Sequence, residues 1–134
     1  MIIFILLTGA CTVFFLFKCF YFRKMIKEKR KEWIQWGLGV DCCCFYSRPF
    51  TVANQYISIN GFQEVVDKKS PICYSLVTVN WWGKRKVFGQ GYIHGDYKDS
   101  KGFQIFMKNI PNGENYQIEV LNGFNMSFGQ FQVK

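Results

Sequence analysis

The sequence is poor in the residues that most enzyme active sites use. It contains one histidine, His94, and its cysteines form no pair at the spacing of a zinc site. Asp96 follows His94 closely and the two could act as a general base, but no nucleophile stands beside them in the sequence. We therefore expect a protein that is not an enzyme, with no cofactor, metal or small-molecule substrate. A small hydrolase using His94 is kept as a remote alternative.

Charge is almost missing from residues 1–22, where Lys18 is the one charged side chain. About 20 apolar residues in a helix match the hydrocarbon thickness of a bilayer. A cleaved signal peptide is disfavoured, because such peptides begin with a basic region and nothing charged precedes Lys18. Residues 1–22 therefore predict a retained, single transmembrane helix, with the lipid bilayer as a partner.

Residues 23–49 follow as a basic membrane-proximal segment that ends in a cysteine-rich junction. In a helix, the aromatic residues near Gly37 fall on one stripe with charges around it, which favours a helix lying on the membrane surface. The alternative is a solvated continuation of the membrane helix with Gly37 as its C-cap. The predicted membrane-surface residues are Arg23, Lys24, Lys27, Lys29, Arg30, Lys31, Trp33 and Trp36.

The positive charge is unevenly distributed along the chain. Residues 1–36 hold seven Lys or Arg against two acids, a balance of +5, and the remaining residues hold ten against seven, a balance of +3. Nucleic acid is therefore not an expected partner of the folded part. Positive residues flanking a span tend to stay in the cytoplasm, so residues 23–134 are predicted on the cytoplasmic side, with the exported side as the alternative.

Residues 50–134 differ in composition, with short runs of Val, Ile, Tyr, Phe and Thr that alternate with polar residues. Tyr116, Ile118 and Val120 share one face of a strand, with Gln117 and Glu119 on the other. A one-residue slip between Phe128 and Phe131 predicts a bulge near Gly129. The expected strands are 52–60, 62–66, 73–82, 86–94, 102–109, 115–121 and 124–133. The fold class is thus mainly β, a transmembrane helix followed by a small seven-stranded β-sandwich.

The stretch "KDSKGFQIFMKNIPNGENYQIEVLNGF" resembles the signature half of carboxypeptidase regulatory-like domains, which belong to the transthyretin-like (prealbumin-like) group. The matching residues are Asp99, Gly102, Phe103, Ile110, Pro111, Gly113, Tyr116, Ile118 and Val120. The residue types of Asp99–Gly102 also predict a turn with Gly102 at a positive φ. The resemblance covers roughly residues 50–134. It implies an accessory, adhesive or protein-contact module. Hydrolases of this group need several histidines, so the resemblance does not imply an enzyme here.

Two clusters of residues are candidate sites. The first combines aromatic and basic residues that suit a protein partner or lipid headgroups, and consists of Trp81, Trp82, Lys84, Arg85 and Lys86. The second consists of Cys42, Cys43, Cys44 and Cys73, for which core packing, S-acylation and a disulfide to Cys73 stay open.

These observations predict a non-catalytic single-pass membrane protein that presents a β-sandwich for protein–protein contact, as an accessory or envelope component. The alternative is a membrane-surface lipid-binding module that uses the basic helix and the hairpin tip at Lys84–Lys86.

Overall fold

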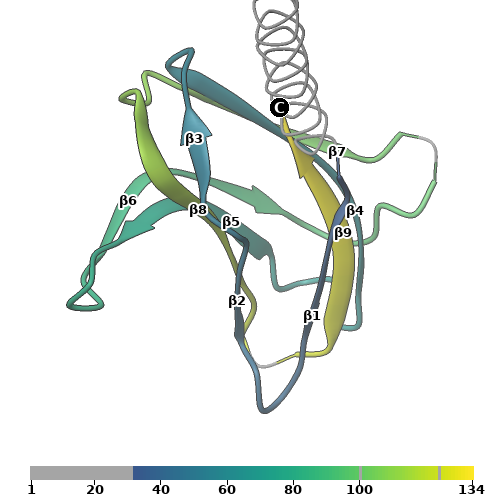
Figure 1. Ribbon diagram of the computed structural model, residues 1–134. Helices are drawn as coiled ribbons and strands as arrows, with labels where there is room; N and C mark the ends of the chain where they lie inside the picture. Colours follow the sequence, from purple (N-terminus) through teal and green to yellow (C-terminus); the bar gives the residue numbers. More distant parts are fainter. Residues whose placement is uncertain (1–31, 100, 124) are drawn as a thin grey trace, which may run out of the picture. The chain divides into compact units, whose positions relative to one another are not determined.

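The computed structural model describes residues 32–99, 101–123 and 125–134, and Trp33–Lys134 form one compact unit. Every helix or strand within the described residues is a β-strand, and the nine strands form two antiparallel sheets that face each other (Figure 1). The expectation of a mainly β, sandwich-like fold is confirmed.

The first sheet has four strands in the order β1-β9-β4-β7. These are β1 (Ile34–Leu38), β9 (Ser127–Val133), β4 (Tyr56–Val65) and β7 (Phe103–Lys108). β4 is the longest, and it pairs with β7 on one edge and β9 on the other. Its inner face alternates with an outer face, as a strand with one buried side should.

The second sheet has five strands, with the path β2-β8-β5-β6 and β3 also paired to β8. These are β2 (Cys44–Tyr46), β3 (Phe50–Val52), β5 (Ile72–Val79), β6 (Arg85–Ile93) and β8 (Gly113–Leu121). β2 and β3 share one edge of β8, because β2 pairs with its last residues and β3 with its first.

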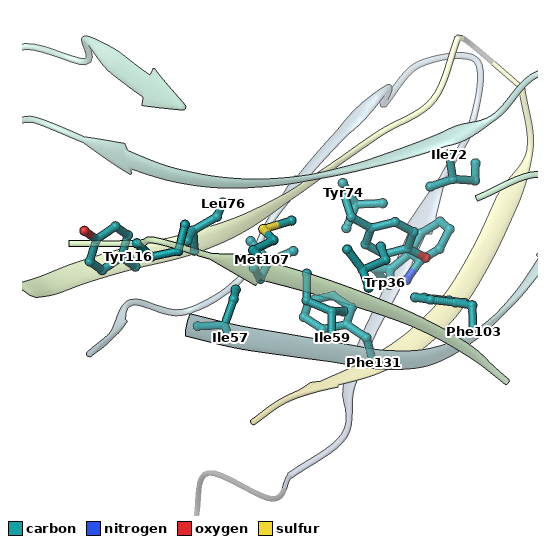
Figure 2. Packing of buried hydrophobic residues seen from close by; sticks show 14 of the residues in the cluster. Trp36, Ile57, Ile59, Ile72, Tyr74, Leu76, Phe103, Met107, Tyr116 and Phe131 are labelled. Carbon is teal, nitrogen blue, oxygen red and sulfur yellow. The ribbon is translucent and has the colours of Figure 1, made fainter. Parts of the chain in front are cut away.

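The inner faces of both sheets meet in one hydrophobic core (Figure 2). Strand β7 shows the pattern most clearly, because Phe103, Ile105 and Met107 are buried while the residues between them are exposed. Aromatic rings fill one end of the core, where Tyr74 lies 4.9 Å from Phe103 and 6.1 Å from Trp36 between ring centroids. Apolar burial of this kind is the main favourable term in folding.

Two glycines allow close packing, Gly129 between neighbouring strands of one sheet and Gly91 between the two sheets. A Cβ at Gly129 would lie 2.3 Å from the carbonyl oxygen of Phe62 and 2.9 Å from the Trp36 ring. A Cβ at Gly91 in β6 would lie 2.7 Å from a methyl group of Ile105 in β7. A side chain at either position would displace the residues that now pack there.

The amino-terminal boundary of the β domain differs from the sequence-based expectation. Strands β1 and β2 lie within the range 23–49 that was assigned to a membrane-proximal segment, so the compact unit begins at Trp33 rather than at residue 50. The expected helical stripe through Trp36 is wrong. Residues Ile34–Leu38 are extended and pair with β9, which turns Trp36 and Leu38 into the core.

The sandwich has nine strands rather than seven, because β1 and β2 precede residue 50; within residues 50–134 the number is seven, but the bounds of some strands differ. The expected strands 52–60 and 62–66 are largely one strand, β4, which continues through Gly61 because the Phe103 ring occupies the space of the missing side chain. The bulge expected near Gly129 is absent, since β9 pairs with β4 in an unbroken register and Phe128 simply faces outward. The turn expected at Asp99–Gly102 is confirmed, with the Gly102 amide bonded to the Asp99 carbonyl at φ +46°.

The predicted transmembrane helix, residues 1–22, lies outside the described residues. Among the residues that the structure does describe, no helix has the length and hydropathy needed to cross a membrane.

Candidate functional site

The loop between β5 and β6 is a turn held by one asparagine. The Asn80 side-chain oxygen accepts hydrogen bonds from the backbone amides of Trp82 and Lys84, at 3.1 and 2.7 Å. The Asn80 backbone amide donates to the Lys84 carbonyl at 3.0 Å, and Gly83 adopts a φ of +78°, which suits glycine. Figure 1 shows this turn extending beyond the neighbouring strands. We call residues Asn80–Lys86 the β5–β6 tip.

Trp81 and Trp82 project from the β5–β6 tip into solvent. Their side chains are 82% and 73% exposed, and the rings are stacked with centroids 3.5 Å apart and planes tilted by 29°. Large aromatic side chains are normally buried at least on one face, because each carries a large apolar area. A stacked indole pair on an ordered turn is therefore a ready contact surface.

The three basic residues of the predicted contact cluster have different surroundings. Lys84 is exposed at the turn, two positions after Trp82 in the sequence. The Lys86 ammonium lies 5.0 Å from the centroid of the Phe88 ring, within the range of a cation–π contact. Arg85 is turned away from the tip toward Glu119. The structure thus leaves Trp81, Trp82 and Lys84 exposed on the turn and pairs Arg85 with Glu119.

Glu119 is a buried acid on the outer face of the five-stranded sheet, and its side chain is 2% exposed. Its carboxylate accepts hydrogen bonds from the Tyr46 hydroxyl at 2.6 Å and from Arg85 Nε and Nη2 at 2.6 and 2.5 Å. The bond to Glu119 raises the pKa of Tyr46 and of Arg85. Three hydrogen bonds from two side chains satisfy the buried charge, which would otherwise be costly.

The sequence did not reveal this Tyr46–Glu119–Arg85 cluster. The alternation in β8 places Glu119 on the outer face correctly, but an outer-face acid is ordinarily solvated. Its burial depends on β2 and β6, which bring Tyr46 and Arg85 to it from 73 and 34 residues away in the chain. No local pattern signals such pairing.

His94 and Asp96 are not joined by a hydrogen bond or ion pair. His94 is exposed, and no hydrogen bond or ion pair joins it to another described residue. Asp96 instead accepts a 2.9 Å hydrogen bond from the Val65 amide and faces Lys68 and Lys98. The Val65 amide, assisted by these lysines, holds the pKa of Asp96 below its usual value. Asp96 therefore anchors the segment after β6 to the end of β4.

The cysteines near the start of the domain are unpaired. Cys44 in β2 and Cys73 in β5 both pair with Leu121, so that β8 lies between them. Strands two apart in a sheet are roughly 9.6 Å from each other, beyond the ~7 Å limit for a disulfide. In this strand order a disulfide between Cys44 and Cys73, one of the alternatives left open by the sequence, is out of reach. Burial raises the pKa of the Cys44 thiol, whereas Cys42 is exposed. Within the described residues, no cluster of His, Cys, Asp or Glu could hold a metal ion.

The predicted membrane-surface residues fall into three groups: those outside the described residues, one in the core, and one partly exposed. Arg23, Lys24, Lys27, Lys29, Arg30 and Lys31 lie outside the described residues. Trp36 is 5% exposed and belongs to the core, so its predicted membrane contact is wrong. Trp33 is 41% exposed and rests on Phe62, with ring centroids 5.5 Å apart.

Comparison with known proteins gives no family. No family model matches the chain, and no curated protein matches it. Two solved structures are distantly similar in fold. A Yersinia pseudotuberculosis-derived mitogen has a TM-score of 0.41 at 5% identity, over 75% of this chain and 83% of that one. A Bacillus endospore appendage protein, described as one of a novel family of disulfide-linked pili, has a TM-score of 0.34 at 11% identity, over 77% and 85%. The transthyretin-like resemblance stays a prediction.

Proposed function

We propose that this chain is a non-catalytic, single-pass membrane protein whose β-domain serves protein–protein contact through the β5–β6 tip. The observation that carries this proposal is the stacked pair of exposed indoles, Trp81 and Trp82. Tryptophan is enriched among the residues that dominate binding energy at protein interfaces. The chain would act as an accessory or envelope component, and the transthyretin-like resemblance supports the same class of role.

The order of the tip favours binding, because little freedom is lost on contact. Asn80 already fixes the turn with hydrogen bonds from the Trp82 and Lys84 amides and from Gly83 to its own carbonyl. Preorganised contact groups lose less conformational entropy when they bind. Burying about 150 Å² of either indole would contribute roughly 4 kcal/mol before the entropic cost of association. The expected partner surface is an apolar pocket with an acidic rim facing Lys84.

A membrane-surface lipid-binding module is the second candidate, and Lys84 and Lys86 beside the two tryptophans favour it. Tryptophan is enriched at the headgroup level, and each basic residue near anionic lipid adds roughly 1 kcal/mol. Arg85 is committed to Glu119, so two of the three basic residues of the tip remain for lipid. This smaller charge makes lipid the weaker candidate.

One crosslinking experiment separates the two candidates. A photo-reactive amino acid replaces Trp82 in the full chain in its own membranes, and the same replacement at exposed Tyr92 serves as control. The proposal expects one defined protein adduct from position 82 that is lost in Trp81→Ala, and no such adduct from position 92. A lipid adduct at position 82, together with flotation on vesicles rich in phosphatidylserine but not on phosphatidylcholine vesicles, would support the second candidate instead. The absence of any adduct would contradict both.

The side of the membrane is part of the proposal. The charge distribution favours a cytoplasmic β-domain, with the exported side as the alternative. Protease protection tests this. A cytoplasmic β-domain is protected in sealed spheroplasts and cut in sealed microsomes, whose outer surface is the cytoplasmic one. An exported β-domain gives the opposite result.

A further inference from the structure

The outer face of the four-stranded sheet is a second exposed surface with its own pattern. The residues on this face, one from every other position of β1, β9, β4 and β7, are Gln35, Gly37, Phe128, Gln130, Gln132, Tyr56, Ser58, Asn60, Phe62, Glu64, Gln104, Phe106 and Lys108, and Trp33, just before β1, packs on Phe62 at the same face. We call this set the amide–aromatic face. It is unusual because large aromatic side chains are exposed on it and charged side chains are scarce.

The aromatic residues lie in two groups toward opposite ends of β4. Phe128 is 56% exposed and pairs with Glu64, and Phe62 is the next outward-facing residue of β4. Phe106 is 62% exposed beside Ser58, and Tyr56 is 53% exposed at the far end. Exposed apolar area gathered on one face marks an interaction site more often than single exposed residues do.

Amides occupy the middle of the face. Asn60 pairs with Gln104 across one edge of β4, and Gln35 pairs with Gln130 between β1 and β9. Each amide offers both a hydrogen-bond donor and an acceptor, so an amide surface is complementary to a copy of itself. The charged residues of the face, Glu64 and Lys108, lie at opposite ends, and Glu64 also pairs with Lys98.

We propose that the amide–aromatic face binds the same face of a second copy of this chain, with the strands of the two copies antiparallel. The two-fold axis of this dimer lies in the contact plane, perpendicular to the strands, and crosses β4 at Asn60. It places each set of residues that are paired across the strands of one copy opposite such a set in the other copy. Phe106 then comes beside Phe62 of the second copy, and Phe128 beside Tyr56. Asn60 and Gln104 meet the same amides, and Glu64 comes one strand away from Lys108.

Charge favours this face over the rest of the surface for contact between two copies. The described β-domain carries ten Lys or Arg against seven Asp or Glu, so that two copies repel each other through most of their surfaces. A contact with one acid and one base per copy avoids this repulsion and adds two symmetry-related pairs of opposite charges, one at each end of the dimer.

The size of the face predicts a weak dimer. Three strand spacings by the length of β4 give a patch of roughly 14 by 30 Å, on the order of 400 Å² of flat area. Stable complexes bury about 800 Å² on each partner, so the dimer is expected to form only at micromolar or higher concentration. This inference does not depend on the β5–β6 tip, and Trp81→Ala should leave the dimer intact.

Site-specific crosslinking between two differently tagged full-length copies tests the proposal. A benzophenone amino acid replaces Phe106, and the control carries it at Tyr92, which is similarly exposed on the other sheet. The expected result is an adduct between copies from position 106 only, joined to the segment that contains Phe62. Adducts of equal yield from both positions, adducts to lipid or another protein, or no adduct at tens of micromolar chain would each overturn the proposal.

Charge reversal gives an independent test of the antiparallel register. Lys108→Glu places two acids together at each end of the dimer and should lower the adduct yield roughly tenfold. Adding Glu64→Lys restores opposite charges and should recover most of the yield. Lys101→Glu, an equal change of charge at an exposed loop residue outside the face, is the control. A yield that follows net charge alone, with Lys101→Glu equal to Lys108→Glu, would contradict this register.

Discussion

Arg85 and Glu119 are joined across an intervening strand. Arg85 begins β6 and Glu119 lies in β8, while β5 runs between them. The guanidinium still reaches the carboxylate with two N–H groups, at 2.6 and 2.5 Å, and so links β6 to β8 through side chains across β5. The Tyr46 hydroxyl adds β2 as a third strand. One buried acid thus connects the base of the β5–β6 tip to the rest of its sheet.

Arg85→Ala should lower the free energy of unfolding by about 2 kcal/mol, because it leaves the buried Glu119 carboxylate with Tyr46 as its one remaining donor. The partial exposure of Arg85 keeps the loss below that of a fully buried pair. Lys84→Ala, which removes an exposed neighbour, should change stability by less than about 0.5 kcal/mol. Urea unfolding of the full chain, followed by tryptophan fluorescence, measures both. Equal effects of the two substitutions would show that the ion pair is not structural.

Stability should fall as the pH rises above about 10, the ordinary pKa of tyrosine. The hydrogen bond to Glu119 raises the pKa of Tyr46, and burial raises the pKa of Tyr74. Both hydroxyls are protonated in folded and unfolded chains below pH 10, so their contribution is fully present there. Above pH 10 the unfolded chain releases these protons first and unfolding is favoured. Tyr46→Phe should flatten the fall in melting temperature between pH 9 and 11, and an unchanged slope would argue against the hydrogen bond.

Gly129→Ala should destabilise the domain by about 3 kcal/mol, since the new methyl group would meet the Phe62 carbonyl and the Trp36 ring. The matched control is Gly37→Ala in the neighbouring strand β1, where a Cβ would meet nothing within 4 Å. That substitution should be neutral or slightly stabilising, because alanine has less freedom to lose on folding. Thermal melts of both variants decide the matter, and similar melting temperatures would contradict the close packing of β9 on β4 and β1.

Trp36→Ala should cost about 4 kcal/mol of folding stability, as expected for removing a buried aromatic ring. Trp33→Ala, on the outer face, should cost about 1 kcal/mol through its contact with Phe62. If Trp36 instead touched lipid, its replacement would weaken membrane attachment and leave unfolding unchanged. Denaturation and membrane flotation of the two variants distinguish these outcomes.

Local patterns predicted the strands whose faces differ clearly. Tyr116, Ile118 and Val120 alternate with polar residues, and all three are buried as expected. The turn at Gly102 followed from turn chemistry that acts within four residues. Such signals depend on neighbours in sequence, so they can be read without knowing the tertiary structure.

The errors arose where the partner is distant in sequence. Ile34–Leu38 is too short to show a period, and its strand conformation depends on β9, about 90 residues later. Phe128 was expected on the inner face because it is apolar, yet the register set by Gly129 and Phe131 turns it outward. The sequence therefore did not predict that Phe128 is exposed, and it did not predict the amide–aromatic face.

The exposure of the β5–β6 tip was anticipated only in part. The sequence brought Trp81, Trp82 and three basic residues together, but it offered no means of separating Arg85 from Lys84. That distinction depends on Glu119, which lies 34 residues from Arg85. Contact residues and structural residues can therefore be adjacent in a charged hairpin.

The position of β8 between Cys44 and Cys73 has a consequence for where this domain can exist. The sheet acts as a spacer that keeps the two thiols out of reach of each other, so an oxidant can modify each of them but cannot link them. Oxidation therefore forms no disulfide between Cys44 and Cys73, and reduction breaks none. This pair of thiols therefore makes no redox demand on the compartment in which the domain folds, because neither a reducing nor an oxidising environment can remove or add a bond between them.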